Sequence, residues 1–332
     1  MRVLVTGTAG FIGFHLARAL IDRGHDVVGV DGLTPYYDIS LKQARRGILE
    51  ATGAFSDHQV LLEDGESLER IVEAAGPEII VHLAAQAGVR YSLENPRAYV
   101  DANLVGTFNL LEAARRHPPR HLLMASTSSV YGGNAKMPFE ETDRADHPLT
   151  LYAASKKATE DMAHAYAHLW RFPVTALRFF TVYGPWGRPD MALFKFVAAA
   201  LAGQPIEVYG HGRMKRDFTY VGDIVEAILR LIDCVPVQGA PIGAFDSLSP
   251  VAPYRTVNVG GGAVVELSAF IGEIEASLGF PIVRALVDMQ PGDVPATLAS
   301  PRLLEALTGF KPSTPVGVGV RRFVDWYRDY YR

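Results

Sequence analysis

Cysteine and long apolar runs are scarce in this 332-residue chain. Its one cysteine, Cys234, allows no internal disulfide and no cysteine-rich metal site, so we expect no metal and a reducing compartment. No apolar run approaches the roughly 18 residues that span a bilayer, and no secretory signal follows Met1. These absences predict a cytoplasmic protein with no membrane partner.

An excess of positive charge is also missing. The chain carries 32 Lys and Arg residues against 36 Asp and Glu residues, a formal net charge of -4, without a long basic block. Since nucleic-acid binding depends on basic patches that neutralise phosphates, we expect no nucleic-acid partner. The 48% of hydrophobic and 20% of charged residues are ordinary for a globular protein and exclude a disordered chain.

Short β-branched runs alternate with Ala- and Leu-rich helical stretches along the first half of the chain. The expected strands are residues 3–6, 27–31, 79–83, 121–126 and 174–178. This alternation predicts βαβ units and a parallel sheet covered by helices. One crossover helix is expected to begin with Asn95 as its N-cap and Pro96 in its first turn, and to end near residue 116.

A glycine-rich turn follows the first expected strand and opens a helix. Gly7, Gly10 and Gly13 have the spacing G-x-x-G-x-x-G, with Phe11 and Ile12 between the last two. Glycines at such a turn let the backbone approach a pyrophosphate, whose charge the free amides of the helix N-terminus stabilise. The pattern predicts a dinucleotide site, and a purely structural strand-to-helix corner is the alternative.

Two aspartates are candidates for contacts to the adenosine half of that dinucleotide. Asp31 ends the second expected strand. A carboxylate there accepts both hydroxyls of an adenosine ribose and repels a 2′-phosphate, so NAD is expected rather than NADP. Asp64 is a weaker candidate, for the adenine amino group. The alternative for either aspartate is a turn or capping role.

Tyr152 and Lys156 stand four residues apart at the start of an expected helix, so their side chains share one face. A free phenol, with a pKa of about 10, is a poor base at neutral pH. A neighbouring ammonium and a nicotinamide cation both favour the phenolate, which suits this pair for acid/base catalysis. A surface tyrosine beside a solvated lysine is the alternative interpretation.

The glycine motif, the Tyr-x-x-x-Lys pair and the Ser/Thr stretch before it resemble the extended short-chain dehydrogenases/reductases, in the NAD-dependent epimerase/dehydratase family. Nearly the whole chain takes part in this resemblance. Four longer strings are more specific and resemble UDP-glucuronate 4-epimerases: residues 87–92, 178–191, 215–220 and 289–295. The resemblance implies an α/β fold, a Rossmann-type doubly wound parallel sheet with a smaller, mixed α/β C-terminal lobe.

The βαβ rhythm weakens in the second half of the chain, which together with the resemblance predicts two interleaved lobes. The NAD-binding Rossmann domain is expected over residues 1–180, with later segments at about 216–234 and 256–262 returning to it. Residues 181–332 are expected to form mainly the UDP-sugar-binding lobe.

For the chemistry, the resemblance implies oxidation and then reduction at C4 of a UDP-sugar with NAD retained. Tyr152 would take the proton of the 4-hydroxyl while hydride passes from C4 to NAD, and the 4-keto sugar would turn and receive hydride on its opposite face. Thr127 falls at the family's hydroxyl position beside the reacting oxygen, and Lys156 would also bind the nicotinamide ribose. The other implied cofactor contacts are Lys42, Leu83, Ala84 and Ala85.

The substrate implied is UDP-glucuronate, because hydroxyls and a guanidinium are suited to hold its C6 carboxylate. These donors are Ser128, Ser129, Thr181 and Arg188. Related dehydratases have Asp-Glu at the two serine positions and related decarboxylases keep Glu at the second, which disfavours both; many UDP-hexose epimerases have Asn at the threonine position. The remaining implied substrate contacts are Arg90, Asp293 and, for the pyrophosphate, Arg216 and Arg213.

Three hypotheses therefore stand at this point. The first is a UDP-glucuronate 4-epimerase, the second a neutral UDP-hexose epimerase or a UDP-glucuronate decarboxylase, and the third an inactive NAD-binding sensor. The intact Tyr152 and Lys156 argue against the third, and Arg188 and Thr181 favour the first over the second. The superfamily also suggests a homodimer through the helices expected around residues 95–116 and 151–170.

Overall fold

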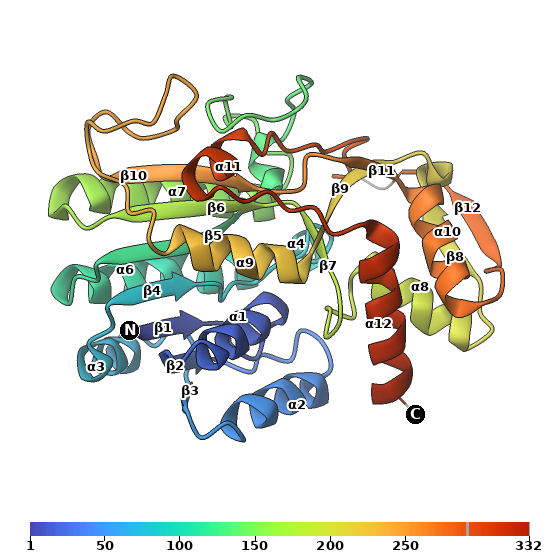
Figure 1. Cartoon of the computed structure of the whole chain (residues 1–332), viewed down its shortest axis with the longest axis horizontal. Helices are drawn as coiled ribbons and strands as arrows, with labels where there is room; N and C mark the ends of the chain where they lie inside the picture. The colour runs from blue at the N-terminus through green and yellow to red at the C-terminus, as the bar shows by residue number, and fades with distance from the viewer. Residues whose placement is uncertain (290–291, 332) are drawn as a thin grey trace.

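The computed structural model describes residues 1–289 and 292–331 of the chain. Its centre is a seven-stranded parallel sheet in the order β10-β6-β5-β4-β1-β2-β3 (Figure 1). The strands are β1 (Arg2–Thr6), β2 (Asp26–Asp31), β3 (Phe55–Gln59), β4 (Ile79–His82), β5 (His121–Thr127), β6 (Val174–Phe179) and β10 (Tyr254–Val259). All five strands expected in the first half of the chain are present, because their apolar runs are buried on both faces of the sheet.

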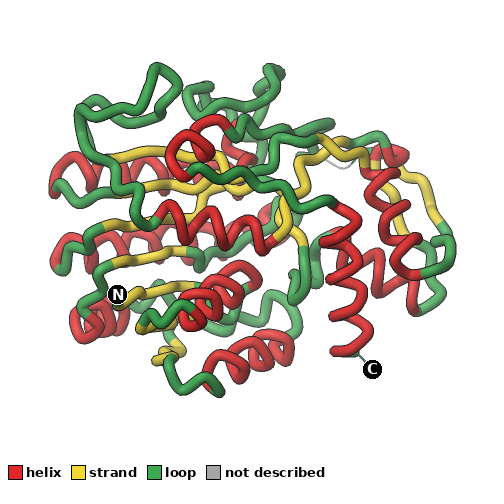
Figure 2. The backbone as a smooth tube through the Cα atoms, viewed as in Figure 1, coloured by secondary structure: helices red, strands yellow, loops and turns green. Residues whose placement is uncertain are grey.

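Helices cover both faces of this sheet, and in Figure 2 they overlap the strands of the main lobe. One face carries α1 (Phe11–Asp22), α2 (Ile39–Glu50), α9 (Val221–Leu231) and α11 (Arg302–Thr308). The other carries α3 (Gly65–Ala75), α6 (Gly106–Arg116) and α7 (Leu151–Trp170). The strand order and the two helical layers confirm the predicted Rossmann-type doubly wound fold.

The crossover expected as one helix over residues 95–116 consists of three segments. After the short α4 (Tyr91–Glu94), α5 (Pro96–Tyr99) leads through a π-helical stretch, η1 (Val100–Val105), into α6. Asn95 occupies the predicted N-cap position, with Pro96 in the first turn of α5, but its side chain donates to the Tyr91 hydroxyl at 2.9 Å and makes no capping hydrogen bond.

The π-helical stretch contains a buried asparagine that connects two parts of the main lobe. Asn103 Oδ1 accepts from the Gln86 N–H at 2.8 Å, and its Nδ2 donates to the Gln86 carbonyl and to the Ser155 hydroxyl, both at 3.0 Å. Single π-helical turns inside helices frequently occur at functional sites. Here the turn ties the loop after β4 to α7.

Strand β3 is absent from the sequence-based expectation. Its five residues, Phe-Ser-Asp-His-Gln, offer one large apolar side chain, and the strand lies at the edge of the sheet, where burial is incomplete. Phe55 connects β3 to the core. Gly29 in β2 leaves space for the Phe55 ring, since a Cβ on Gly29 would lie 2.3 Å from that ring.

The second lobe has small sheets and its own helices. One sheet contains β7 (Thr181–Tyr183), β9 (Lys215–Tyr220) and β11 (Val264–Glu266); the other pairs β8 (Ile206–Tyr209) with β12 (Arg284–Val287). The helices are α8 (Ala192–Leu201), α10 (Leu267–Leu278) and α12 (Val316–Tyr330), with short 3-10 turns η2 (Ser128–Tyr131) and η3 (Gly210–Gly212) elsewhere. Aromatic side chains fill this core, and Phe218 stacks on Phe270 with ring centroids 4.0 Å apart.

The two lobes interleave along the chain. After the second lobe has begun, α9 packs beside α1 on the main sheet and β10 pairs with β6. The return expected from residue 216 begins only with α9, because residues 215–220 form β9 of the small sheet. Within residues 1–289 and 292–331, no helix combines the length and apolar character that crossing a membrane requires.

Glu141 is a buried carboxyl group between the main sheet and the segment that follows η2. Its Oε1 accepts a hydrogen bond from the backbone N–H of Asn258 in β10 at 2.8 Å. Burial is the largest influence on this group and raises the pKa of Glu141 to about 7. A carboxyl group whose pKa rises on folding stabilises the folded protein below its unfolded pKa, and this contribution disappears as the pH rises through the folded pKa.

We therefore expect the free energy of unfolding to fall as the pH rises from 4.5 to about 7, with a contribution from Glu141 of at most about 3 kcal/mol. The variant Glu141→Gln keeps the Oε1 acceptor and removes the titration, so it should lose this part of the pH dependence. Urea unfolding of parent and variant at about pH 5 and about pH 8 measures the difference. The same pH dependence in both proteins would contradict the assignment.

Candidate active site

A cavity of about 470 Å³ opens at the carboxyl ends of the central strands, where the strand order reverses between β1 and β4. In open α/β sheets this is the place where ligands bind. Its walls come from the glycine turn, the loops after β2, β4 and β5, the start of α7, β7 and the loop before α8. Both lobes therefore contribute to one cavity.

The glycine turn fits the close approach of a pyrophosphate. Gly7 has φ +81°, and a Cβ on it would lie 2.8 Å from the Ala84 nitrogen; a Cβ on Gly13 would lie 2.0 Å from the Gly7 carbonyl oxygen. Gly10, at the N-cap of α1, provides no side chain to cap the helix amides. The N-terminus of α1 is thus bare and faces the cavity, as a dinucleotide phosphate requires. The expected neighbours Phe11, Ile12, Leu83, Ala84 and Ala85 also line the cavity.

Asp31 and Lys42 lie at the same end of the cavity. Asp31 Oδ2 accepts from the Ala9 N–H at 3.0 Å and Oδ1 from the Leu33 N–H at 2.8 Å. Each carboxylate oxygen has a further lone pair, so both retain capacity for a ribose hydroxyl. The Lys42 ammonium donates to the Thr34 carbonyl at 2.7 Å.

Asp64 does not reach the cavity, contrary to the expectation of an adenine contact. It is exposed and caps α3, where its Oδ1 accepts from the Ser67 N–H at 3.0 Å. This hydrogen bond lowers the pKa of Asp64. Asp64 therefore has the capping role that the sequence analysis gave as the alternative. The preceding residues 61–63 line the cavity in its place.

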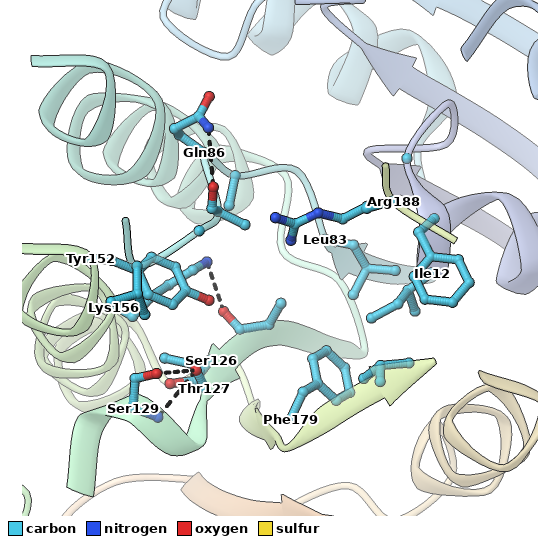
Figure 3. A pocket seen from close by; sticks show the side chains of 18 of the residues that line it. Ile12, Leu83, Gln86, Ser126, Thr127, Ser129, Tyr152, Lys156, Phe179 and Arg188 are labelled. Carbon is cyan, nitrogen blue, oxygen red and sulfur yellow. Dashed lines mark hydrogen bonds between the residues drawn. The ribbon is translucent and has the colours of Figure 1, made fainter. Parts of the chain in front are cut away.

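Tyr152, Lys156 and Thr127 meet in the middle of the cavity, beneath the first turns of α7 (Figure 3). The Thr150 hydroxyl caps α7 by accepting from the Ala153 N–H at 3.3 Å, which fixes where the helix begins. The Lys156 ammonium donates to the Ala125 carbonyl in β5 at 3.0 Å and has two further protons for a ligand.

The groups that shift the pKa of Tyr152 are not all those expected from the sequence. Burial raises the pKa of Tyr152, while the Thr127 hydroxyl and the Arg188 guanidinium act to lower it. Burial also lowers the pKa of Lys156 to about 8, against the attraction of Glu160. The Arg188 guanidinium is thus a cation acting on the Tyr152 phenol that the sequence analysis did not assign to it.

Glu160 is a site residue that the sequence analysis missed. It lies one turn beyond Lys156 on α7, is buried, accepts from the Ser126 hydroxyl at 2.6 Å, and forms a two-pronged ion pair with Arg178 at 2.9 and 2.8 Å. The ion pair joins α7 to β6, and the Ser126 hydrogen bond joins α7 to β5. The signal for it in the sequence was the spacing of four residues from Lys156, which continues the same helix face.

The expected carboxylate donors all line the cavity, but they come from different parts of its wall. Ser128 and Ser129 are in η2, Thr181 begins β7, and all three line the cavity. The Thr127 hydroxyl donates to Ser129 Oγ at 3.2 Å. Arg188 lies across the cavity from Tyr152 and Lys156, and its guanidinium points toward them (Figure 3).

The two arginines expected to bind the substrate pyrophosphate, Arg216 and Arg213, differ in whether they reach the cavity. Arg216 lines the cavity and is partly buried; in the described part of the chain no carboxylate forms an ion pair with it, and burial lowers its pKa. Arg213 is exposed and does not line the cavity. Arg90 stays outside it too, but forms an ion pair at 3.4 Å with Asp293, which lines it. Gln290 and Pro291, part of the string 289–295, lie outside the described residues.

Arg45 is a second residue that the sequence analysis missed. It is fully buried on α2 and donates to three backbone carbonyls, those of Ala9 at 2.8 Å, Trp186 at 2.6 Å and Gly187 at 3.2 Å. It thereby fastens the loop that carries Arg188 to the glycine turn. In the sequence, an arginine in a polar helix is typical of an exposed face, so no signal pointed to this role.

Comparisons with known proteins agree with this geometry. The sequence profile described as the NAD dependent epimerase/dehydratase family matches residues 3–240. A protein of Rhizobium meliloti named "Probable UDP-glucuronate 4-epimerase" is 61% identical over 335 residues, covering 100% of this chain and 98% of the relative. UDP-glucuronate 4-epimerase 1 of Arabidopsis thaliana is 45% identical, covering 99% of this chain and 77% of the relative.

Among solved structures, the UDP-glucuronic acid 4-epimerase of Bacillus cereus, in complex with UDP-glucuronic acid and NAD, superimposes with a TM-score of 0.89. It is 28% identical, and the match covers 100% of both chains. The family profile spans more than half of the chain, and the identity to the Rhizobium protein extends over its whole length. The chain therefore belongs to the NAD dependent epimerase/dehydratase family.

Proposed function

We propose that this protein is a UDP-glucuronate 4-epimerase, which interconverts UDP-glucuronate and UDP-galacturonate with NAD as its cofactor. The observation that carries the proposal is a single cavity with an acid/base group, Tyr152 with Lys156 and Thr127, on one side, with the Ser129 hydroxyl next to Thr127, and the Arg188 guanidinium directed toward them from the opposite side. A guanidinium in that cavity suits a sugar carboxylate. The names of the relatives and of the Bacillus structure agree with the acidic sugar.

The roles of the chain's own residues follow from their positions. Bound NAD supplies the acceptor and donor of hydride. Tyr152 removes the proton of the sugar 4-hydroxyl, with the Thr127 hydroxyl beside it as a hydrogen-bond partner for the reacting oxygen. After the 4-keto sugar has turned, hydride returns to the opposite face of C4 and the same phenol returns its proton to the O4 oxygen. Lys156 holds the ribose next to the nicotinamide, and its charge favours the phenolate once a ligand closes the cavity.

The test is incubation of the purified protein with UDP-glucuronate, without added NAD, followed by NMR of the products. We expect a mixture of UDP-glucuronate and UDP-galacturonate. A UDP-pentose would indicate the decarboxylase instead. No reaction with UDP-glucuronate, together with interconversion of UDP-glucose and UDP-galactose, would indicate the neutral-hexose epimerase.

The purified protein should carry NAD that does not exchange with added nucleotide, because each turnover regenerates it and its release would leave the keto sugar behind. The Asp31 carboxylate disfavours a 2′-phosphate at that end of the cavity. Heating the protein and separating the released nucleotides by chromatography identifies the cofactor. Recovery of NADP, or activity that depends on added NADP, would contradict this prediction.

We also propose that two copies of the chain form a homodimer in the cytoplasm, each with an NAD-binding domain of residues 1–180, to which α9 and β10 return, and a UDP-sugar-binding lobe made mainly of the rest. Support for the dimer comes from η1, α6 and α7, which expose Val105, Phe108, Leu169 and Trp170. Exposed apolar side chains on neighbouring helices are typical of an interface. Light scattering during size-exclusion chromatography should give twice the chain mass of 36.2 kDa. A monomer mass would rule the dimer out.

A further inference from the structure

The Arg188 guanidinium has a fixed partner within its own loop. Its Nε donates to Asp190 Oδ1 at 3.0 Å and its Nη2 to Asp190 Oδ2 at 2.5 Å, so both carboxylate oxygens meet one edge of the guanidinium plane. Two parallel bonds of this kind fix the direction of the arginine side chain as well as its charge. Burial acts to raise the pKa of Asp190, but Arg188 holds it below its usual value, so the carboxylate is ionised at neutral pH.

A tyrosine from the other lobe completes this arrangement. Tyr36, in the loop between β2 and α2, donates from its hydroxyl to Asp190 Oδ2 at 3.1 Å, and its ring centroid lies 5.9 Å from Arg188 Cζ. Burial raises the pKa of Tyr36 to about 12, so it remains a donor. Gly88 makes the position possible, since a Cβ there would lie 2.6 Å from the Tyr36 hydroxyl.

The opposite edge of the Arg188 guanidinium is left for a ligand. Asp190 uses Nε and one N–H of Nη2, and no acceptor among the described residues bonds to Nη1. Arginine has five N–H donors in a planar fork, so an edge formed by Nη1 and Nη2 can bind a second carboxylate. Figure 3 shows the guanidinium directed into the cavity, toward the side that holds Tyr152.

We propose that Asp190 and Tyr36 are positioning residues that determine the specificity for an acidic sugar, by orienting Arg188 so that its free edge meets a sugar carboxylate. This inference rests on the proposed function. Without Asp190 the arginine keeps its charge but loses its direction, and the C6 carboxylate loses a partner in a fixed place. Neither Asp190 nor Tyr36 is needed to bind the UDP part or a neutral hexose.

The test measures binding in a Tyr152→Phe background, where no turnover interferes. Calorimetry gives the Kd values of UDP-glucuronate, UDP-glucose and UDP for this parent and for the added substitutions Asp190→Asn and Tyr36→Phe. We expect UDP-glucuronate to bind about tenfold more weakly with Asp190→Asn and several-fold more weakly with Tyr36→Phe, as for a lost hydrogen bond to a charged group. The Kd values of UDP-glucose and UDP should stay within about twofold.

Matched substitutions control for the loss of a hydroxyl or a charge as such. Tyr91→Phe removes a hydroxyl from the ring that packs on Tyr36 at 4.7 Å, and Asp101→Asn removes an exposed carboxylate paired with Arg97. Both should leave the preference for UDP-glucuronate unchanged. If Asp190→Asn does not fold, Tyr36→Phe alone decides, since it keeps the ring and loses one hydrogen bond.

The outcomes separate this inference from the proposed function. Equal weakening of all three ligands would mean a merely structural role, and an unchanged Kd for UDP-glucuronate would mean that Asp190 and Tyr36 do not orient Arg188; either result overturns the inference alone. If the parent binds UDP-glucose as tightly as UDP-glucuronate, the acidic-sugar function fails and the inference fails with it.

Discussion

Replacing Tyr152 with phenylalanine is expected to lower kcat for C4 epimerisation by about 10²–10⁴-fold, the usual contribution of a general acid/base group. The phenol lines the cavity, and Thr127 and Arg188 both act to favour its ionised form. The ring remains in the variant, so its packing against Tyr99, with centroids 6.0 Å apart, should persist. Initial rates with UDP-glucuronate, followed by chromatography of the two epimers, give the change.

The control for this variant is binding. UDP should bind to Tyr152→Phe with the Kd of the parent, because the nucleotide contacts lie elsewhere, and the NAD content should be unchanged. Turnover close to that of the parent would refute Tyr152 as the base. A rate loss accompanied by loss of NAD would point to damage to the fold.

Arg188→Ala should change the products as well as the rate. Once C4 is oxidised, the C6 carboxylate is β to a ketone, and carbon dioxide is lost easily when the C5–C6 bond aligns with the carbonyl π system. We propose that Arg188, held by Asp190, and the hydroxyls of Ser128, Ser129 and Thr181 hold the carboxylate out of that alignment. We expect kcat/KM for UDP-glucuronate to fall by about 10–100-fold, the effect of a lost charge-assisted hydrogen bond.

The product ratio distinguishes this role from simple loss of binding. The share of UDP-4-keto-pentose among the products of Arg188→Ala should rise above that of the parent, as NMR of the reaction mixture would record. Epimerisation at the parent's rate without added decarboxylation would mean that Arg188 is not the carboxylate anchor.

The sequence predicted those parts of the fold in which local pattern and burial agree. Strands such as β1 and β5 contain a continuous apolar run, residues 3–5 and 122–125, that is buried on both faces, so the run itself identifies them. β3 is polar and lies at the sheet edge, and its pairing with β2 depends on a contact between Phe55 and Gly29 that no local pattern records. The π-helical turn at residues 100–105 is also a tertiary effect, since its stabilising bonds go to Gln86 and Ser155.

In the candidate site, too, some residues could be predicted from local sequence and others depend on the fold. Gly7, Tyr152 and Lys156 could be predicted because short motifs place them, whereas Asp64 was expected in the cavity and caps a helix. Arg45 and Asp190 act through partners far away in the sequence or through a folded loop, so their side chains have no motif. Sequence reasoning found the groups that face the ligand and missed those that hold them.

The central claim, that C4 itself is oxidised and reduced within one closed cavity, is tested most directly with UDP-glucuronate deuterated at C4. The account predicts that UDP-galacturonate forms with deuterium still at C4, without exchange into solvent water, because the hydrogen removed from C4 is returned there before the sugar leaves. NMR of the product in ordinary water reads this out. Loss of the deuterium to water, or its retention in a product that is not the C4 epimer, would contradict the account.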